Sequence, residues 1–372
     1  MPPMRTPHVS RRQFLHVIGG ATALAAGARD VASADQSTPL PPAGSLTDVG
    51  GMRVGHFTDP RRPTGCTAIL FDKPATAGAD YDGSAPGESL GVVLQPVSPL
   101  DQIHSIFLTG GGPMALGATA GVVRFLEERH VGYDWGVPNV RVPIVVGAVI
   151  DDLSLGDGRI RVGPEEAYRA CESASAAAVV EGSVGAGTGA TVGKMFVGRG
   201  MRGMKGGVGS ASMRLGDVVI SALVVLNAAG DIVDWRQGAI VAGARTADGR
   251  GFARSVDMLR RDLETRGAAV APLADDPLRA TTLAVVATNV ALTKTQLTKL
   301  AMMANTGAAR AINPYHTQGD GDQVLAVSTG LSKADVSLTA IGAIAAEVVA
   351  DAIVRAAKLA TSVPGWTAVR DL

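Results

Sequence analysis

Apolar runs of strand length follow one another along this chain, and helices separate only some of them. The run DVVISALVVLN at 217–227 predicts a long buried strand, and the pattern continues at 231–235 after a turn. Nearer the start, MRVGHFTD and GCTAILFD predict a hairpin joined through residues 60–65. Because strands adjoin strands as well as helices, this order favours an α+β layered sandwich over a strict βαβ repeat.

The remaining pattern supplies the helices and the other strands. Strands are predicted at 105–109, 140–150, 283–287 and 324–328. Helices are predicted at 114–129, 165–181, 254–266, 294–311 and 336–359. Pro164 precedes the second of these helices and suits a helix start.

The composition limits the number of domains and the kinds of binding partner that we expect. The chain has 372 residues, 46% of them hydrophobic, which is enough for a large core in one domain or two. Its formal net charge is zero, so electrostatics does not favour nucleic acid or an acidic membrane surface as a partner. Cys66 and Cys171 lack metal-ligand spacing and fit either one disulfide or two buried thiols.

The first 34 residues have the pattern of a twin-arginine export signal. An arginine pair at 11–12 precedes a modestly apolar run at 14–26, and Ala-Ser-Ala at 32–34 fits a cleavage site. The mature protein would begin near Asp35 with a Pro-rich linker at 35–45, and it would be periplasmic or secreted. The alternative is an ordinary basic N-terminal helix.

Two glycine-rich segments come close to phosphate-binding motifs. GTGATVGKM has Thr188 where a P-loop needs glycine and Met195 where it needs a Mg²⁺-binding hydroxyl. The G-x-G at 110–112 lacks the third glycine of a dinucleotide fingerprint. Nucleotide binding is therefore disfavoured, and no cofactor is expected. Gly111 and Gly112 either bring backbone amides close to a substrate or form a turn.

Several polar residues each allow a functional and a structural interpretation. Lys194 is either a donor in a pocket or an exposed loop lysine, and Asn227 is either an oxyanion donor or a turn residue. Asp320 and Asp322 flank a glycine and could hold an ammonium group or form an Asx turn. Further acidic ligands for calcium are missing, so no metal is expected. His316, alone nearby, is more often structural.

The junction at Thr281-Thr282 invites a different chemistry. Both threonines stand before an apolar strand, after a segment that reads as an exposed linker. If the Ala280–Thr281 bond were cut, the Thr281 hydroxyl would lie beside a free α-amine, whose ordinary pKa is roughly 7.7–8.0. Nucleophile and general base would then belong to one residue. The local alternative, β-branched residues that open a strand, is the more common one.

These stretches together resemble one family over about residues 46–357. It is the family of N-terminal-nucleophile amidohydrolases that includes the D-aminopeptidase/β-peptidyl aminopeptidases and the nylon-oligomer (6-aminohexanoate-oligomer) hydrolases. The resemblance rests on PTGCTAIL, LTGGGPMALGATAGV, VPIVVGAVIDD, GAGTGATVGK, VVLNAAGDIVD, TTLAVVATN, INPYHTQGDGD and TAIGAIAAEVVADAI. The downstream half looks closer to the nylon-oligomer hydrolases. The resemblance implies a four-layer αββα sandwich, self-processed into two chains and assembled as a tetramer of processed heterodimers.

The family's functional residues fall on residues already singled out here. The resemblance places the nucleophile on Thr281, the lysine on Lys194, the asparagine on Asn227, and the acidic pair on Asp320 and Asp322. It implies a cut between residues 280 and 281, which divides a single hydrolase domain (46–372) into chains of about 35–280 and 281–372.

Two positions depart from the nylon-oligomer hydrolases. Ala280 replaces the asparagine before the nucleophile, which bears on the rate of self-cleavage. Asp151 replaces a tyrosine and is expected to add a carboxylate near the pocket. Asp151, Gly111 and Gly112 are the residues expected to contact the substrate. The implied function is hydrolysis of peptide or ω-amino-acid oligoamide bonds by an N-terminal threonine, without metal or cofactor. The rival interpretation is a non-catalytic periplasmic binding or scaffold protein on the same fold.

Overall fold

A computed structural model describes residues 40–266 and 280–372, which belong to one compact unit. One large sheet runs through it. Its strands are β1 (Met52–Thr58), β2 (Gly65–Asp80), β3 (Glu88–Ser89), β4 (Gln102–Thr109), β7 (Val145–Val149), β10 (Val208–Leu215), β11 (Val218–Asn227), β14 (Thr281–Val290) and β16 (Gln323–Ser332). Their order is β10–β11–β14–β16–β2–β4–β7–β3, and β1 pairs with β2. The pairs β14/β16 and β4/β7 are parallel within this otherwise antiparallel sheet.

The sheet folds back on itself, so that its two halves pack face to face. Strands β7 and β14 come into contact although β16, β2 and β4 lie between them in the sheet. One buried cluster joins Leu223 and Val285 from the first half to Ile106 and Val146 from the second. The long strand β2 connects the halves, because it pairs with both β16 and β4.

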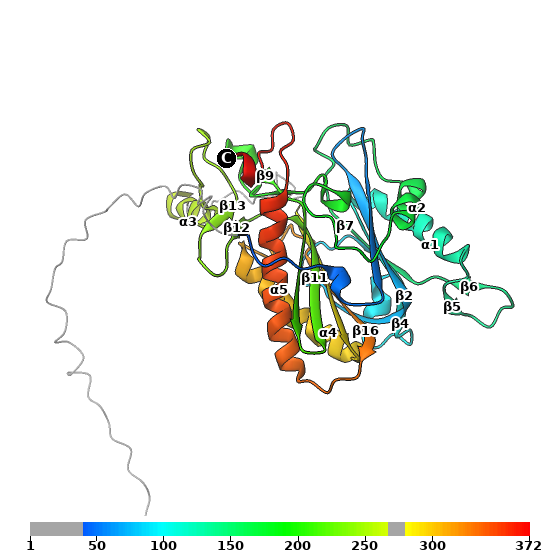
Figure 1. Cartoon of the computed structure of the whole chain (residues 1–372). Coiled ribbons are helices and arrows are strands. Elements are labelled where there is room, and N and C mark those ends of the chain that lie inside the picture. Colours follow the sequence, from blue (N-terminus) through cyan, green and yellow to red (C-terminus); the bar gives the residue numbers. More distant parts are fainter. Residues whose placement is uncertain (1–39, 267–279) are drawn as a thin grey trace, which may run out of the picture. The chain divides into compact units, whose positions relative to one another are not determined.

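Helices cover the outer faces of both halves (Figure 1). Those on the outer faces are α1 (Thr119–Glu127), α2 (Pro164–Glu172), α4 (Lys294–Ala311) and α5 (Leu338–Leu359). Helix α3 (Ser255–Arg266) lies apart from these faces, and its Met258 and Leu259 pack in the small cluster of Phe196. Leu300 of α4 and Val349 of α5 share a core with Val286 of β14, whereas Val122 of α1 packs in the cluster of Phe107 of β4. The structure is therefore a mixed α+β fold, in which helices pack on both halves of a mixed sheet.

Strand β14 shows how this packing orients the two threonines. Its side chains alternate: Leu283 and Val285 point between the two halves of the sheet, and Ala284 and Val286 point toward α4 and α5. By this period of two, Thr281 belongs to the inner face and Thr282 to the helix-covered face. The strand start therefore sends two adjacent hydroxyls into different layers.

The second helix is shorter in the structure than the sequence predicts. It was expected at 165–181 but ends at Glu172. The chain then leaves the helix because Ser175 exchanges two backbone hydrogen bonds with Val54 on the edge strand β1 (3.0 and 3.1 Å). Farther on, Glu181 pairs with Arg355 of α5. Pairing with distant elements, which local pattern does not register, displaces the last two turns of the expected helix.

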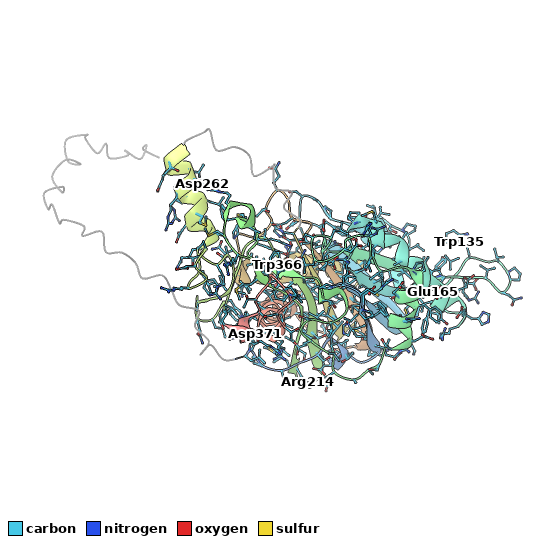
Figure 2. All side chains as sticks on the ribbon, turned by 90° about the horizontal axis from the view of Figure 1, so that it is seen from above. Trp135, Glu165, Arg214, Asp262, Trp366 and Asp371 are labelled. Atoms are coloured by element: carbon cyan, nitrogen blue, oxygen red, sulfur yellow. The ribbon has the colours of Figure 1, made fainter. Side chains whose placement is uncertain are left out.

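Short strands complete the fold. They are β5 (Tyr133–Asp134), β6 (Arg141–Val142), β8 (Thr191–Val192), β9 (Met204–Lys205), β12 (Asp231–Val233), β13 (Ile240–Ala242) and β15 (Ile312–Asn313). The run expected at 231–235 belongs to the small sheet β13–β12–β15 instead of the large one. Figure 2 shows Trp135, on the β5–β6 hairpin, standing away from the layered strands.

The N-terminal predictions fall partly outside the described residues. The proposed export signal at 1–34 lies there entirely, as does the linker up to residue 39. In the described end of that linker, the Pro41 carbonyl accepts a hydrogen bond from Arg355 (2.8 Å). Ser45 caps a short 3-10 turn at Leu46–Asp48. This end of the segment therefore lies against α5.

Candidate active site

A small cavity opens where β14 begins. Its volume is about 180 Å³, and its walls combine both halves of the sheet. The lining residues are Ala85, Gly87, Pro113, Val149, Asp151, Gly319, Ala280 and Thr281. The predicted cleavage position thus borders a cavity in the same layer as the inner face of β14.

Thr281 is held between strands on both sides. It pairs with Asn227 at the end of β11, and Ala280 bridges to Asp320 just before β16. Its side chain is largely buried, and Oγ1 donates to the Ala280 carbonyl oxygen at 2.6 Å. The hydroxyl therefore touches the carbonyl group of the bond expected to be cut.

Thr282 has different surroundings. Its backbone N–H donates to Asp322 Oδ1 at 2.6 Å, and its own Oγ1 has no hydrogen-bond partner among the described residues. Only Thr281 lines the cavity, and only its hydroxyl contacts the preceding carbonyl. The geometry favours Thr281 as the nucleophile of the pair.

Lys194 and Asn227 form one hydrogen-bonded unit. Lys194 Nζ donates to Asn227 Oδ1 at 2.7 Å and to Thr191 Oγ1 at 3.2 Å. The Thr191 N–H donates to the same amide oxygen at 3.0 Å. On its other side, Asn227 Nδ2 donates to the Asp151 carbonyl at 3.3 Å. Asn227 is fully buried, so these contacts fix the orientation of its amide.

Two charged groups of this site have pKa values near neutral pH. Burial lowers the pKa of Lys194 to about 7, against the opposing pull of Asp320 and three other carboxylates. Burial, followed by repulsion from Asp322, raises the pKa of Asp320 to about 6. The Asp320 carboxylate accepts the Thr317 N–H through Oδ2 (2.8 Å), while its buried Oδ1 has no partner among the described residues. Both groups can therefore change charge near neutral pH.

Of the three residues expected to contact substrate, Asp151 borders the cavity, whereas Gly111 and Gly112 lie in a turn. Asp151 lines the cavity, and its Oδ1 accepts the Leu153 N–H at 2.9 Å. Gly111 and Gly112 have positive φ angles, and their N–H groups donate to Asp152 Oδ1 (2.9 Å) and the Ile150 carbonyl (3.1 Å). These two amides are occupied within the protein, which favours the turn interpretation for both glycines.

Two supporting residues, His316 and Arg62, received no functional role from the sequence. His316 Nδ1 lies 3.3 Å from Asp322 Oδ2, so this histidine belongs to the acidic turn. Arg62 forms a buried ion pair with Asp152 (2.7 Å) and also donates to that residue's carbonyl (2.8 Å), directly after Asp151. The adjacency of Asp152 to Asp151 was visible in the sequence. The contribution of Arg62, 90 positions upstream, was not.

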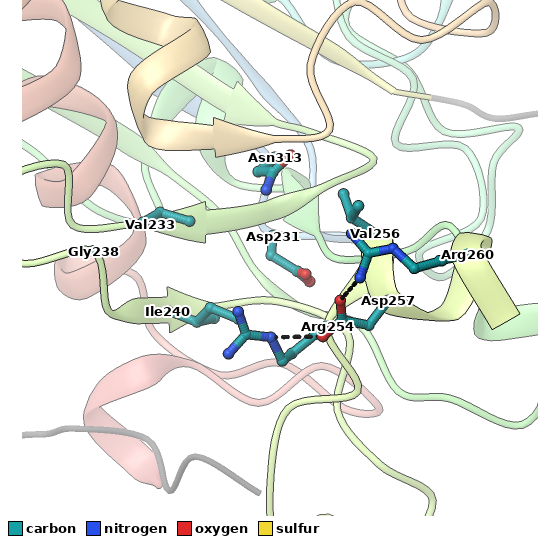
Figure 3. A pocket seen from close by; sticks show the side chains of 9 residues that line it. All are labelled: Asp231, Val233, Gly238, Ile240, Arg254, Val256, Asp257, Arg260 and Asn313. Carbon is teal, nitrogen blue, oxygen red and sulfur yellow. Dashed lines mark hydrogen bonds and ion pairs between the residues drawn. The ribbon is translucent and has the colours of Figure 1, made fainter. Parts of the chain in front are cut away.

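We also considered a second cavity, the cysteines and possible metal ligands in the described parts of the chain. A cavity of about 250 Å³ near α3 contains Arg254 and Arg260, and both pair with Asp257 (3.0 and 2.8 Å), as Figure 3 shows. Cys66 and Cys171 are free and buried. Within residues 40–266 and 280–372, no group of three or more acidic, histidine or cysteine residues could hold a metal. No helix in those ranges is long and apolar enough to cross a membrane.

Comparison with known sequences identifies a family for this chain. Residues 44–370 match the model of peptidase family S58. An uncharacterized aminopeptidase of Mycobacterium tuberculosis (strain H37Rv) is 36% identical, over 88% of this chain and 97% of its own length. A 6-aminohexanoate-oligomer endohydrolase of Kocuria sp. is 34% identical, over 84% of this chain and 85% of its own length.

Solved structures show the same fold. A Burkholderia sp. β-aminopeptidase superposes with a TM-score of 0.61 at 24% identity, covering 87% of this chain and 90% of its own. An L-aminopeptidase D-Ala-esterase/amidase from Ochrobactrum anthropi, described as a variant of the Ntn-hydrolase fold, gives 0.59 at 22%, covering 87% and 88%. Fold and sequence thus agree on an amide-bond hydrolase with an N-terminal-nucleophile fold. The chain belongs to peptidase family S58.

Proposed function

We propose that this protein is a self-cleaving N-terminal-threonine amidohydrolase that acts on short peptides or ω-amino-acid oligoamides. The observation that carries the proposal is the contact between the Thr281 hydroxyl and the Ala280 carbonyl at the edge of a cavity. Family membership supports hydrolysis of amide bonds, and it makes a non-catalytic scaffold the less favoured alternative.

The proposed reaction has two stages. First, Thr281 Oγ attacks the Ala280 carbonyl carbon, and water hydrolyses the resulting ester, which leaves Thr281 as a new N-terminus. Second, the freed α-amine accepts the hydroxyl proton, directly or through water, and Oγ attacks the carbonyl of a substrate amide. Hydrolysis of the acyl-enzyme completes the cycle.

The neighbouring groups support both stages. Asn227 lies directly opposite Thr281 across the strand pair, where its side-chain amide, together with backbone N–H groups of the site, can stabilise an oxyanion. Asp320 offers an unpartnered buried oxygen to the new ammonium group. The carboxylates favour the charged form of that amine, and protonated Lys194 favours the neutral form.

N-terminal sequencing of the purified protein tests this scheme. We expect a fragment that begins at Thr281 and, for the exported protein, a second that begins near Asp35. Thr281→Ala should stay uncut and inactive, whereas Thr282→Ala, which removes a hydroxyl outside the cavity, should still be cut. A single intact chain that hydrolyses amides would refute the scheme, and loss of cutting in Thr282→Ala alone would move the nucleophile by one residue.

The substrate class needs a separate measurement. Relatives named aminopeptidase and oligomer endohydrolase point to two substrate types. A β-alanyl or D-alanyl amide would report attack beside a free amino end, and a 6-aminohexanoate oligomer would report internal cutting. Gel filtration of the cut protein would test the expected homotetramer.

A further inference from the structure

The carbonyl group of Ala280 is held from two directions. Its oxygen accepts the Thr281 hydroxyl at 2.6 Å and the Gly321 backbone N–H at 3.0 Å. Ala280 is buried, so solvent offers little competition for this oxygen. A hydrogen bond from a fixed amide polarises a carbonyl and stabilises the negative charge that forms there during nucleophilic attack.

The Gly321 amide is fixed because its turn is tied to another loop. The Ala85 N–H donates to the Asp320 carbonyl at 2.9 Å, and the Gly83 N–H donates to the Asp322 carbonyl at 3.1 Å. These bonds brace both neighbours of Gly321. A donor held in this way needs no reorganisation when charge develops on the oxygen.

Only glycine allows this approach. A Cβ atom at position 321 would lie 2.5 Å from the Ala85 carbonyl oxygen and 2.8 Å from Thr281 Oγ1. Both distances are shorter than van der Waals contact, and the first atom belongs to the backbone. The missing side chain therefore brings the 320–322 turn against the scissile bond.

We propose that the Gly321 N–H is the oxyanion donor of the self-cleavage step. This inference rests on the proposed function. As Thr281 Oγ bonds to the Ala280 carbon, the carbonyl oxygen becomes an oxyanion that accepts the Gly321 N–H. The C–N bond then breaks, the hydroxyl proton is transferred to the leaving nitrogen, and the chain becomes an ester. Water then releases the Ala280 carboxylate and regenerates the hydroxyl.

An amide-to-ester exchange tests this role with little change of shape. Glycolic acid introduced at position 321 in a cell-free translation replaces the N–H with an oxygen atom. The same exchange at Gly83 is the matched control, because it removes a bond of the same turn that does not reach Ala280. A denaturing gel followed over time reports the cutting rate, and circular dichroism reports folding.

We expect the exchange at 321 to slow self-cleavage by about 10²–10³, the usual effect of losing one oxyanion donor, and the exchange at 83 to change it little. Cutting at the wild-type rate with the ester at 321 would overturn the inference, and so would equal slowing by both esters. Absence of cutting in the wild type would instead refute the proposed function.

A conventional substitution gives a second measurement. Gly321→Ala should also slow cutting, because the added methyl group displaces the turn from the scissile bond. Gly117→Ala is its control, since a Cβ atom there meets nothing within 4 Å. A folded Gly321→Ala protein that cuts at the wild-type rate would overturn the inference.

Discussion

Two lysines of the same glycine-rich segment, Lys194 and Lys205, have similar acidity and different surroundings; Lys205 is fully buried and Lys194 is half-buried. Burial lowers the pKa of both Lys194 and Lys205 to about 7. Lys205 Nζ donates to three backbone carbonyls, those of Gly187, Ala190 and Gly206 (3.2, 2.8 and 2.8 Å). Lys194 Nζ instead donates to two side chains, Asn227 and Thr191.

The difference shows that a lowered pKa does not by itself identify a catalytic lysine. The Lys205 ammonium uses its donors to hold the loop that carries Lys194. Lys194 lies among carboxylates whose attraction opposes the effect of burial, and it is hydrogen-bonded to Asn227, the residue that pairs with Thr281. The contacts of the ammonium group, more than its pKa, separate a structural lysine from a functional one.

Removing each ammonium group should separate the two roles most clearly. We expect Lys194→Met to lower self-cleavage and turnover by about 10²–10⁴, because it removes a group positioned for proton transfer and the partner of Asn227. Lys205→Met should change both rates far less. Time courses on denaturing gels and initial rates with an amide substrate provide the comparison, and equal losses in the two variants would erase the distinction.

Stability should show the opposite ranking. Lys205→Met leaves three buried carbonyls without this donor, so we expect a loss of about 1–3 kcal/mol in urea unfolding at pH 7. The loss should grow from pH 7 toward 10, because the unfolded lysine there binds more protons than the folded one and wild-type stability rises with pH. A deficit that shrinks over that range would contradict the contacts assigned to Lys205.

The acidic partners of Lys194 should appear in the pH profile. Asp320→Asn removes a carboxylate that favours the charged form of the Thr281 amine, so the amine should lose its proton at lower pH. In the fraction that has been cut, the acidic limb of kcat/KM should shift to lower pH. An unchanged limb would place Asp320 out of contact with the amine. Lys205→Met should leave the limb in place.

The smallest effect should come from Thr191, whose hydroxyl is one of the two side-chain partners of Lys194. Thr191→Val removes the hydroxyl bonded to Nζ and should lower turnover several-fold, in line with about 0.5–1.5 kcal/mol for one hydrogen bond. Thr188→Val is the control, because the Thr188 hydroxyl donates to the Gly185 carbonyl in the same segment. Equal turnover losses in both variants would indicate a general loosening of the loop.

Much of the fold followed from periodicity. The helix at 294–311 appears as expected, and the strand expected at 283–287 lies within the longer strand Thr281–Val290, because each has a strong pattern of its own. The end of the second helix at Glu172 and the strand Ile240–Ala242 were not predicted, because partners distant in sequence define them. Local pattern cannot register such partners.

The site was harder to predict from the sequence than the fold. Locally, the functional interpretation was the less common one for Thr281 and Asn227 and evenly balanced for Lys194, and the family resemblance connected the three residues. The support from Arg62 and the approach of Gly321 depend on turns brought together by folding, and no spacing along the chain encodes them. The direction in which each threonine points required the register of β14.

The central place of β14 has a consequence for assembly. Its neighbours are β11, from before the proposed cut, and β16, from after it. Both new ends would therefore be created inside a sheet that is already built, and the two pieces would stay together until the protein is denatured. Activity would then depend on completed folding, because the nucleophile is aligned only when strands from both pieces are in register. The cut would therefore be made only in molecules whose sheet has formed correctly.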